Sequence, residues 1–131
     1  MPDDQTADDG VLLLVDDDDV LRTAVLRLLE LEGFACVEAR SSGEAQEVLR
    51  SRGDVALMLC DVTMPVGSGI ELLTKVHRDY PAVAVVMLTG ADNPNLARFA
   101  LEHGAKAYLT KPFDHDVLLD TVRSALASRT S

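Results

Sequence analysis

The sequence predicts a single α/β domain in which five parallel strands alternate with five helices. Short apolar runs bounded by turn residues alternate along the chain with longer stretches of helical period, which is typical of a βαβ series. Several of the runs are almost uninterrupted apolar residues, as expected for strands that helices cover on both faces. At 131 residues, 47% of them hydrophobic, the chain can form one ordinary core and is too short for two full domains.

The five strand candidates are the apolar runs themselves. The first, third and fourth are the most continuous, so we place them in the centre of the sheet, with the two shorter and more mixed runs at its edges. In chain order the runs are Val11–Val15, Phe34–Val37, Val55–Cys60, Val83–Leu88 and Ala105–Leu109.

The first two helices have recognisable start signals. Asp18 or Asp19 can cap the first, which ends before Gly33, and Ser41 with Glu44 has the spacing of a capping box for the second. The residues expected on their buried faces are Leu21, Val25, Leu28, Leu29, Ala45, Val48 and Leu49.

The last three helices begin with similar signals, and Gly104 closes the fourth. The start signals are Ser68 with Glu71, Asn93 with Pro94 at the first helical position, and Asp114. The residues expected on the buried faces of the third and fifth helices are Ile70, Leu73, Val76, Val117, Leu118, Val122 and Leu126.

The predicted domain spans residues 10–127. Residues 1–9 form an acidic segment that we expect to be disordered, and residues 128–131 form a tail or the start of a linker. The net charge of −10 argues against nucleic-acid binding, which needs clustered Lys and Arg. Signal-peptide features and long apolar runs are both lacking in the sequence, so we expect a cytoplasmic protein with no membrane contact.

Polar residues follow four of the five predicted strands. The first strand runs into Asp16 and Asp17, the third into Asp61 and the fourth into Thr89, and Lys111 closely follows the fifth. In open α/β sheets the carboxyl ends of the strands form the ligand-binding edge, so these side chains are expected at one rim. Each also has a simpler interpretation, because Asp often caps a helix, Thr before Gly suits a turn, and Lys can be a solvated cation.

Three carboxylates gathered at this rim would repel one another unless a cation lay between them. Mg²⁺ prefers oxygen ligands from one or two carboxylates together with waters and phosphate oxygens. A carboxylate at such a site can also act as a nucleophile and form an aspartyl phosphate, with a hydroxyl and an ammonium holding the other phosphoryl oxygens.

Five short motifs follow one another along the chain, and the match that they support extends from residue 11 to about 127. They are LLLVDD at 12–17, LCDVTMP at 59–65, GIELL at 69–73, VVMLTG at 85–90 and GAKAYLTKPF at 104–113. In this order and at these strand ends they resemble the receiver domain of two-component response regulators. The resemblance implies a doubly wound, flavodoxin-like (βα)₅ sheet of strand order 2-1-3-4-5.

The resemblance also implies a role for each rim residue. Asp61 is the phosphoacceptor, Asp17 coordinates Mg²⁺ directly, Asp16 helps through water, and the backbone carbonyl of Thr63 supplies another ligand. The hydroxyl of Thr89 is implied to shift toward the phosphoryl group, with which Lys111 pairs. Tyr108 is implied to be the aromatic switch residue. Without the motif, the sequence favours interpreting Tyr108 as an aromatic residue at the edge of the core.

The implied function is a switch that a sensor histidine kinase or phosphotransfer protein phosphorylates. The phosphoryl group would bias a surface made by the fourth helix, fifth strand and fifth helix, and that surface would engage an output domain or a downstream partner protein. Phosphorylation-dependent homodimers are common in similar proteins. Lys106 stands where the winged-helix DNA-binding subfamily often has an acidic residue used in dimer contacts, which argues against that particular dimer.

In the implied strand order, the strands that carry Cys36 and Cys60 flank a third strand, which separates the two thiols by about 10 Å. This distance is beyond disulfide reach, so we expect two reduced, buried thiols.

Two other functions remain open at this point. A haloacid-dehalogenase-type phosphohydrolase also uses an aspartate after a first strand, and the Asp17-x-Asp19 spacing gives it nominal support, although Asp61 would then have no role. A degenerate receiver could serve as an interaction module alone. A calcium loop of the EF-hand type is excluded, because counting from Asp16 places Leu21 and Arg27 where that loop needs Gly and an acid.

Overall fold

The computed structural model describes residues 10–62, 68–90 and 94–128. Within them, five strands and five helices alternate, and the strands form one parallel sheet of order β2-β1-β3-β4-β5. The strands are β1 (Val11–Val15), β2 (Ala35–Ala39), β3 (Val55–Asp61), β4 (Ala84–Gly90) and β5 (Ala107–Lys111). The helices are α2 (Asp19–Leu31), α3 (Ser42–Ser51), α4 (Ser68–Asp79), α5 (Pro94–Glu102) and α6 (His115–Ser128). The predicted fold class and strand order are confirmed.

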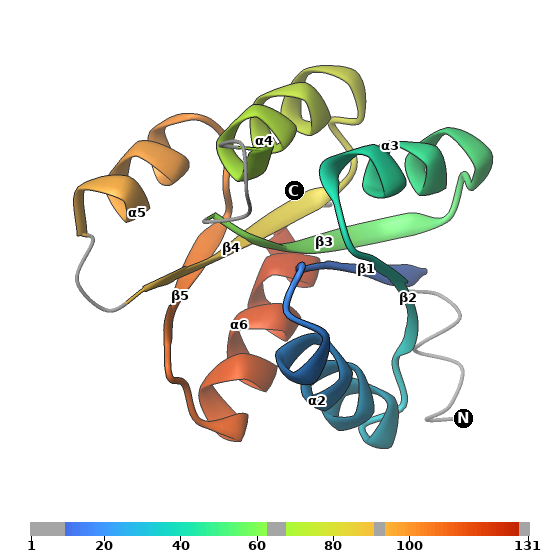
Figure 1. The fold of residues 1–131 in the computed structure, drawn as a ribbon, viewed down its shortest axis with the longest axis vertical. Helices are drawn as coiled ribbons and strands as arrows, with labels where there is room; N and C mark the ends of the chain where they lie inside the picture. Colours follow the sequence, from blue (N-terminus) through green and yellow to red (C-terminus); the bar gives the residue numbers. More distant parts are fainter. Residues whose placement is uncertain (1–9, 63–67, 91–93, 129–131) are drawn as a thin grey trace.

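The sheet is the middle of three layers (Figure 1). Helices α2 and α6 cover one face, and α3, α4 and α5 cover the other. Because successive side chains of a strand point to opposite faces, each central strand feeds both cores. In β1, for example, Leu12 and Leu14 pack on the α2 and α6 side, whereas Leu13 and Val15 pack on the opposite side.

The central strands are buried as the sequence predicted. Every residue of β1 and β3 is buried, and so is every residue of β4 before Gly90, whereas β2 and β5 have mixed exposure. Strands covered on both faces are built mainly from apolar residues, here Leu, Val, Met and Ala, which is why the three runs read as continuous apolar segments. The predicted division into central and edge strands is therefore confirmed.

Both edge strands begin later in the chain than predicted. Strand β2 runs over Ala35–Ala39 instead of Phe34–Val37, because its register matches the whole of β1, from Val11 opposite Ala35 to Val15 opposite Ala39. Glu38 therefore lies within β2, one residue beyond the predicted end of the strand.

Strand β5 covers Ala107–Lys111 instead of Ala105–Leu109. Gly104 has a φ of 113°, a conformation that glycine adopts without strain, and it turns the chain after α5. The amides of Ala105 and Lys106 then bond to Ala100 and Val85, so the ladder of β5 begins two residues later than the apolar run.

The first two helices begin directly after their predicted caps, and α4 begins one residue earlier than predicted. Asp18 is the N-cap of α2 and accepts hydrogen bonds from the amides of Val20 and Leu21, and Ser41 is the N-cap of α3 and accepts one from Glu44. Helix α4 begins at Ser68 itself, which was predicted as its cap. Asn93, predicted to precede α5, lies outside the described residues.

The predicted buried face of α6 was wrong at one position. Val117 is 47% exposed, whereas Leu119 and Ala125 are buried beside the correctly predicted Leu118, Val122 and Leu126. The buried stripe is thus rotated toward Leu119, which joins the core that α2 and α6 form against the sheet.

Both cysteines are free, as expected from strands that flank β1. Cys60 is buried, but Cys36 on the edge strand is only partly buried, which corrects the prediction of two buried thiols. Burial and then the nearby Glu30 and Glu38 raise the pKa of Cys36 to about 12.

Among the described residues, none of the helices combines the length and apolar character that crossing a membrane requires.

Candidate functional site

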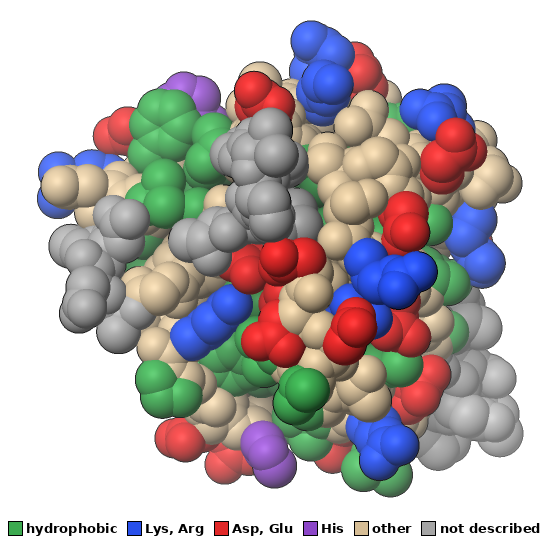
Figure 2. Space-filling model, in the orientation of Figure 1, with side chains coloured by type: hydrophobic (Ala, Val, Ile, Leu, Met, Phe, Trp, Pro, Cys, Tyr) green, Lys and Arg blue, Asp and Glu red, His purple; other side chains and the backbone are tan. Residues whose placement is uncertain are grey.

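The carboxyl ends of four strands bring the predicted rim residues to one edge of the sheet. Asp16 directly follows β1, while Asp61 and Lys111 are the last residues of β3 and β5, and Thr89 is the last but one of β4. The order reverses between β1 and β3, which is where ligands bind in open α/β sheets. Figure 2 shows acidic side chains gathered near the middle of the face of the molecule that it displays, with basic side chains beside them.

Three carboxylates form the centre of this rim. One oxygen from each of Asp16, Asp17 and Asp61 lies within 4.8 Å of the others. Asp16 and Asp61 are 3% and 4% exposed, whereas Asp17 is exposed to solvent. Two of the negative charges are therefore held away from water at close range, which is costly without a counter-charge.

Asp16 shows this cost most clearly. Its Oδ1 accepts a hydrogen bond of 2.9 Å from the amide of Asp18, but its buried Oδ2 has no hydrogen-bond partner among the described residues. Burial first, and then the charge of Asp61, raise the pKa of Asp16 above its ordinary value. The amide bond from Asp18 and the Lys111 cation act in the opposite direction and are not enough to cancel the shift.

Lys111 supplies a cation at the other side of the cluster. Its Nζ donates a hydrogen bond of 3.2 Å to Asp61 Oδ2 and lies 3.9 Å from Asp16 Oδ2. The Lys111–Pro112 peptide bond is cis. One ammonium cannot neutralise three carboxylates, so the cluster keeps an excess of negative charge.

The start of α4 packs tightly against the acceptor strand. A Cβ atom on Gly69 would lie 2.5 Å from the backbone carbonyl oxygen of Asp61 and 2.7 Å from Val62. Glycine at this position therefore allows the helix to pass directly over the residue that ends β3. The motif GIELL marks this approach in the sequence.

Thr89 and Tyr108 lie beside the acidic cluster on β4 and β5. Thr89 is buried, and its hydroxyl donates a hydrogen bond of 3.1 Å to the Gly90 carbonyl. Tyr108 is paired with Met87 in the sheet, and its side chain is 41% exposed. Thr63, for which a metal-ligand role is implied by the resemblance, lies outside the described residues.

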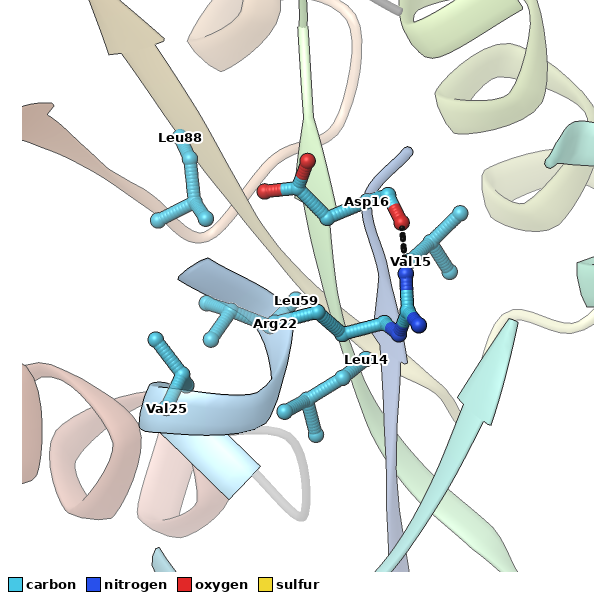
Figure 3. A pocket seen from close by; sticks show the side chains of 7 residues that line it. All are labelled: Leu14, Val15, Asp16, Arg22, Val25, Leu59 and Leu88. Carbon is cyan, nitrogen blue, oxygen red and sulfur yellow. Dashed lines mark hydrogen bonds between the residues drawn. The ribbon is translucent and has the colours of Figure 1, made fainter. Parts of the chain in front are cut away.

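A buried arginine, which the sequence analysis missed, lies under the acidic loop. Arg22 of α2 is 8% exposed and donates a hydrogen bond of 2.7 Å to the backbone carbonyl of Asp16 (Figure 3). Its sequence signal is spacing, because it precedes Val25 by three residues and Leu29 by seven, on the buried stripe of the helix. A charged residue on the buried face of a helix is rarely buried unless it is paired, so this spacing predicts partners for Arg22.

The donor set fits a hard divalent cation. Mg²⁺ takes oxygen ligands at short range and commonly uses one or two carboxylates together with waters and phosphate oxygens. Asp16, Asp17 and Asp61 offer three carboxylates, and the Asp16 oxygen that lacks a described partner is the kind of atom that a bound cation would satisfy. The residues present are therefore compatible with the metal implied by the sequence.

Comparisons of the sequence with known proteins all indicate the same family. The family model of the response regulator receiver domain matches residues 12–123. The transcriptional regulatory protein CseB of Streptomyces coelicolor is 38% identical over 121 residues, which cover 92% of this chain and 50% of that protein. The cyclic di-GMP phosphodiesterase of Thermotoga maritima is 35% identical over 118 residues, which cover 90% of this chain and 31% of that protein.

Solved structures agree with these sequence relatives. A response regulator receiver domain protein from Clostridium thermocellum superposes with a TM-score of 0.86 at 27% identity, covering 92% of this chain and 97% of that one. The chain thus spans nearly all of a lone receiver domain but half or less of the two curated relatives, whose named activities are their own.

Proposed function

This chain belongs to the family of response regulator receiver domains, and on that premise we propose that Asp61 accepts a phosphoryl group in a Mg²⁺-dependent reaction. The observation that carries the proposal is the buried Asp61 carboxylate, which shares one rim with two further carboxylates and with the Lys111 ammonium. The donor would be the phosphohistidine of a sensor histidine kinase or of a phosphotransfer protein.

The chemistry is a displacement at phosphorus. A carboxylate oxygen of Asp61 forms the new O–P bond, the N–P bond of the phosphohistidine breaks, and the released imidazole keeps the electron pair and takes a proton from water. Lys111, already 3.2 Å from Asp61, is placed to pair with a phosphoryl oxygen. The buried hydroxyl of Thr89 can pair with another once it leaves the Gly90 carbonyl.

Asp16, Asp17 and Asp61 would hold the Mg²⁺, and the Thr63 carbonyl is proposed as a further ligand. When bound, the cation would neutralise charge on the carboxylates and on the incoming phosphoryl oxygens. The excess negative charge of the cluster supports this assignment, since Lys111 alone cannot balance it.

Phosphorylation would be read out on the surface made by α5, β5 and α6. Thr89 lies in β4, next to β5, and Tyr108 in β5 is exposed, so a movement of the threonine toward the phosphoryl group would leave room for the tyrosine to turn inward. We propose that this surface engages an output domain or a downstream partner protein, and that a second copy of the chain is one such partner.

The phosphohydrolase alternative finds less support. Asp19, which it would use with Asp17, is hydrogen-bonded to Arg22 at 2.7 Å, and the carboxylate cluster of the described residues contains Asp61 in its place. We therefore keep Asp61, and not Asp17, as the proposed nucleophile.

Acetyl phosphate tests the proposal directly. Wild-type protein incubated with acetyl phosphate and MgCl₂ should gain the mass of one phosphoryl group by intact-mass spectrometry, and EDTA should prevent the gain. Asp61→Asn should show no gain, whereas Asp79→Asn, a change at an exposed aspartate on α4, should behave as wild type. Unreduced uptake by Asp61→Asn would show that the assignment is wrong.

A further inference from the structure

Arg22 makes contacts with three separate parts of the molecule. Its Nη1 donates to the Asp16 carbonyl, its Nε to Glu38 Oε1 and its Nη2 to Asp19 Oδ1, each at 2.7 Å. These partners belong to the loop after β1, to β2 and to the first residue of α2. The planar guanidinium can reach all three at once because its donors are arranged as a fixed fork.

The side chain of Arg22 runs through apolar surroundings before it reaches these acceptors. Figure 3 shows it beside Leu14, Val25 and Leu59, in a small pocket that also borders Asp16. The carboxylates of Asp19 and Glu38 are exposed, so solvent screens their attraction to Arg22 and these ion pairs contribute little to stability. Fold stability alone therefore gives little reason for a cation at this point.

The contact with Asp16 restrains the start of the acidic cluster. The Asp16 amide donates to the Ala39 carbonyl at 3.1 Å, and the Asp16 carbonyl accepts from Arg22, so the backbone of this residue is held on both sides. That carbonyl belongs to the peptide that joins Asp16 to Asp17. The orientation of this peptide influences the direction in which the side chains of Asp16 and Asp17 project from the backbone.

We propose that Arg22 is a positioning residue for the cation site: by holding the Asp16–Asp17 peptide, it keeps both carboxylates turned toward Asp61. The inference rests on the proposed binding of Mg²⁺ at this cluster. It assigns to Arg22 a role that depends on the geometry of its donors rather than on its charge.

Charge and geometry predict effects of opposite sign. A guanidinium near the cluster repels a divalent cation, so an arginine that acted through its charge alone would, when removed, allow tighter Mg²⁺ binding. A positioning arginine would, when removed, weaken the binding, and residues that orient metal ligands typically change metal affinity by about 10- to 100-fold. The sign of the change therefore separates the two roles.

The test is calorimetric titration of the metal-free protein with MgCl₂, with variants Arg22→Lys and Arg22→Met. Lysine keeps the charge but loses the fork, and Met keeps the aliphatic stem alone. Both should bind Mg²⁺ about tenfold more weakly than wild type. Amide exchange followed by NMR without metal should be faster at Asp16 and Asp18, whose amides depend on this backbone geometry.

Val25→Ala is the matched control, because it removes a buried side chain from the same helix without touching Asp16. It should lower stability and leave Mg²⁺ affinity as in wild type. If Arg22→Lys and Arg22→Met do not fold, Glu38→Ala replaces them, with Glu38→Gln as its equal-charge control, because Gln keeps an oxygen that can accept from Arg22 Nε. Glu38→Ala should bind Mg²⁺ more weakly than Glu38→Gln.

Binding by both Arg22 variants that equals or exceeds wild type would overturn the positioning role while leaving the proposed function intact, and equal affinity of the two glutamate variants would do the same. A wild-type protein that shows no heat of Mg²⁺ binding, and no Mg²⁺-dependent phosphorylation, would instead remove the proposed function and this inference with it.

Discussion

The four consecutive aspartates form two pairs that share a residue type but not an environment. Asp16 is buried and Asp17 is exposed, and both belong to the carboxylate cluster at the end of β1. Asp18 and Asp19 are exposed and have local partners, since Asp18 accepts from the first amides of α2 and Asp19 pairs with Arg22. The chain passes from strand to helix between the two pairs.

The difference shows how position decides what a carboxylate does. At a helix start, free amides and the helix dipole stabilise a negative charge, so Asp18 and Asp19 are satisfied by the fold itself. At the end of a buried parallel strand the same charge meets other carboxylates, and Asp16 keeps an oxygen with no described hydrogen-bond partner. This contrast supports the proposal that the first pair binds a cation, whereas the second pair stabilises the start of α2.

The largest expected effect separates the pairs by metal binding. Asp17→Asn should weaken Mg²⁺ binding by roughly a hundredfold, equivalent to about 2.8 kcal/mol, because it removes one of the carboxylates of the cluster. Asp19→Asn should change the affinity little, since Asp19 lies outside the cluster and Asn keeps an oxygen that can accept from Arg22. Calorimetric titration of both variants measures the difference, and equal losses of affinity would contradict the division of the run.

The second effect concerns the helix start and should appear in stability instead. Asp18→Ala removes the N-cap of α2 and should lower the free energy of unfolding by about 1 kcal/mol in urea denaturation. Asp18→Asn keeps a capping oxygen and should lose less. A cap variant that was as stable as wild type would show that Asp18 does not belong to the structural pair.

The smallest effect is a pH-dependent gain in stability for Asp16→Asn without metal. The raised pKa of Asp16 means that the folded state holds the proton more tightly than the unfolded state. The free energy of unfolding of the wild type should therefore fall as pH rises above 3.8, the ordinary value, and Asn removes this penalty.

Urea denaturation with EDTA should thus find Asp16→Asn more stable than wild type at pH 7, with the difference vanishing below pH 3.8. Added Mg²⁺ should stabilise the wild type more than the variant. A variant that is no more stable than wild type at pH 7 would argue against repulsion within the cluster.

Much of this arrangement could be predicted because parallel topology is simple. Once Val11–Val15 and Val55–Cys60 are identified as buried strands, their carboxyl ends must share an edge, and Asp16 and Asp61 follow. The order of residues in the chain was enough to place the rim. The raised pKa of Asp16 results first from burial, and the sequence could predict only that this residue follows a buried strand.

The remaining features depend on partners that are distant in the sequence. The bounds of β2 are set by its register with β1, and those of β5 by the bond from Lys106 to Val85. Arg22 is buried because Glu38, sixteen residues away, and the Asp16 carbonyl converge on it. Local patterns report propensity and period, but they do not report which side chains tertiary packing brings together.

Borohydride mapping of the phosphorylated protein tests the central claim most directly. Borohydride reduces an aspartyl phosphate to homoserine, and peptide mass spectrometry then identifies the residue that carried the phosphoryl group. After treatment with acetyl phosphate and MgCl₂, we predict homoserine at position 61 and unchanged aspartate at Asp16, Asp17, Asp18 and Asp19. Homoserine at any of these four positions in place of 61 would contradict the account.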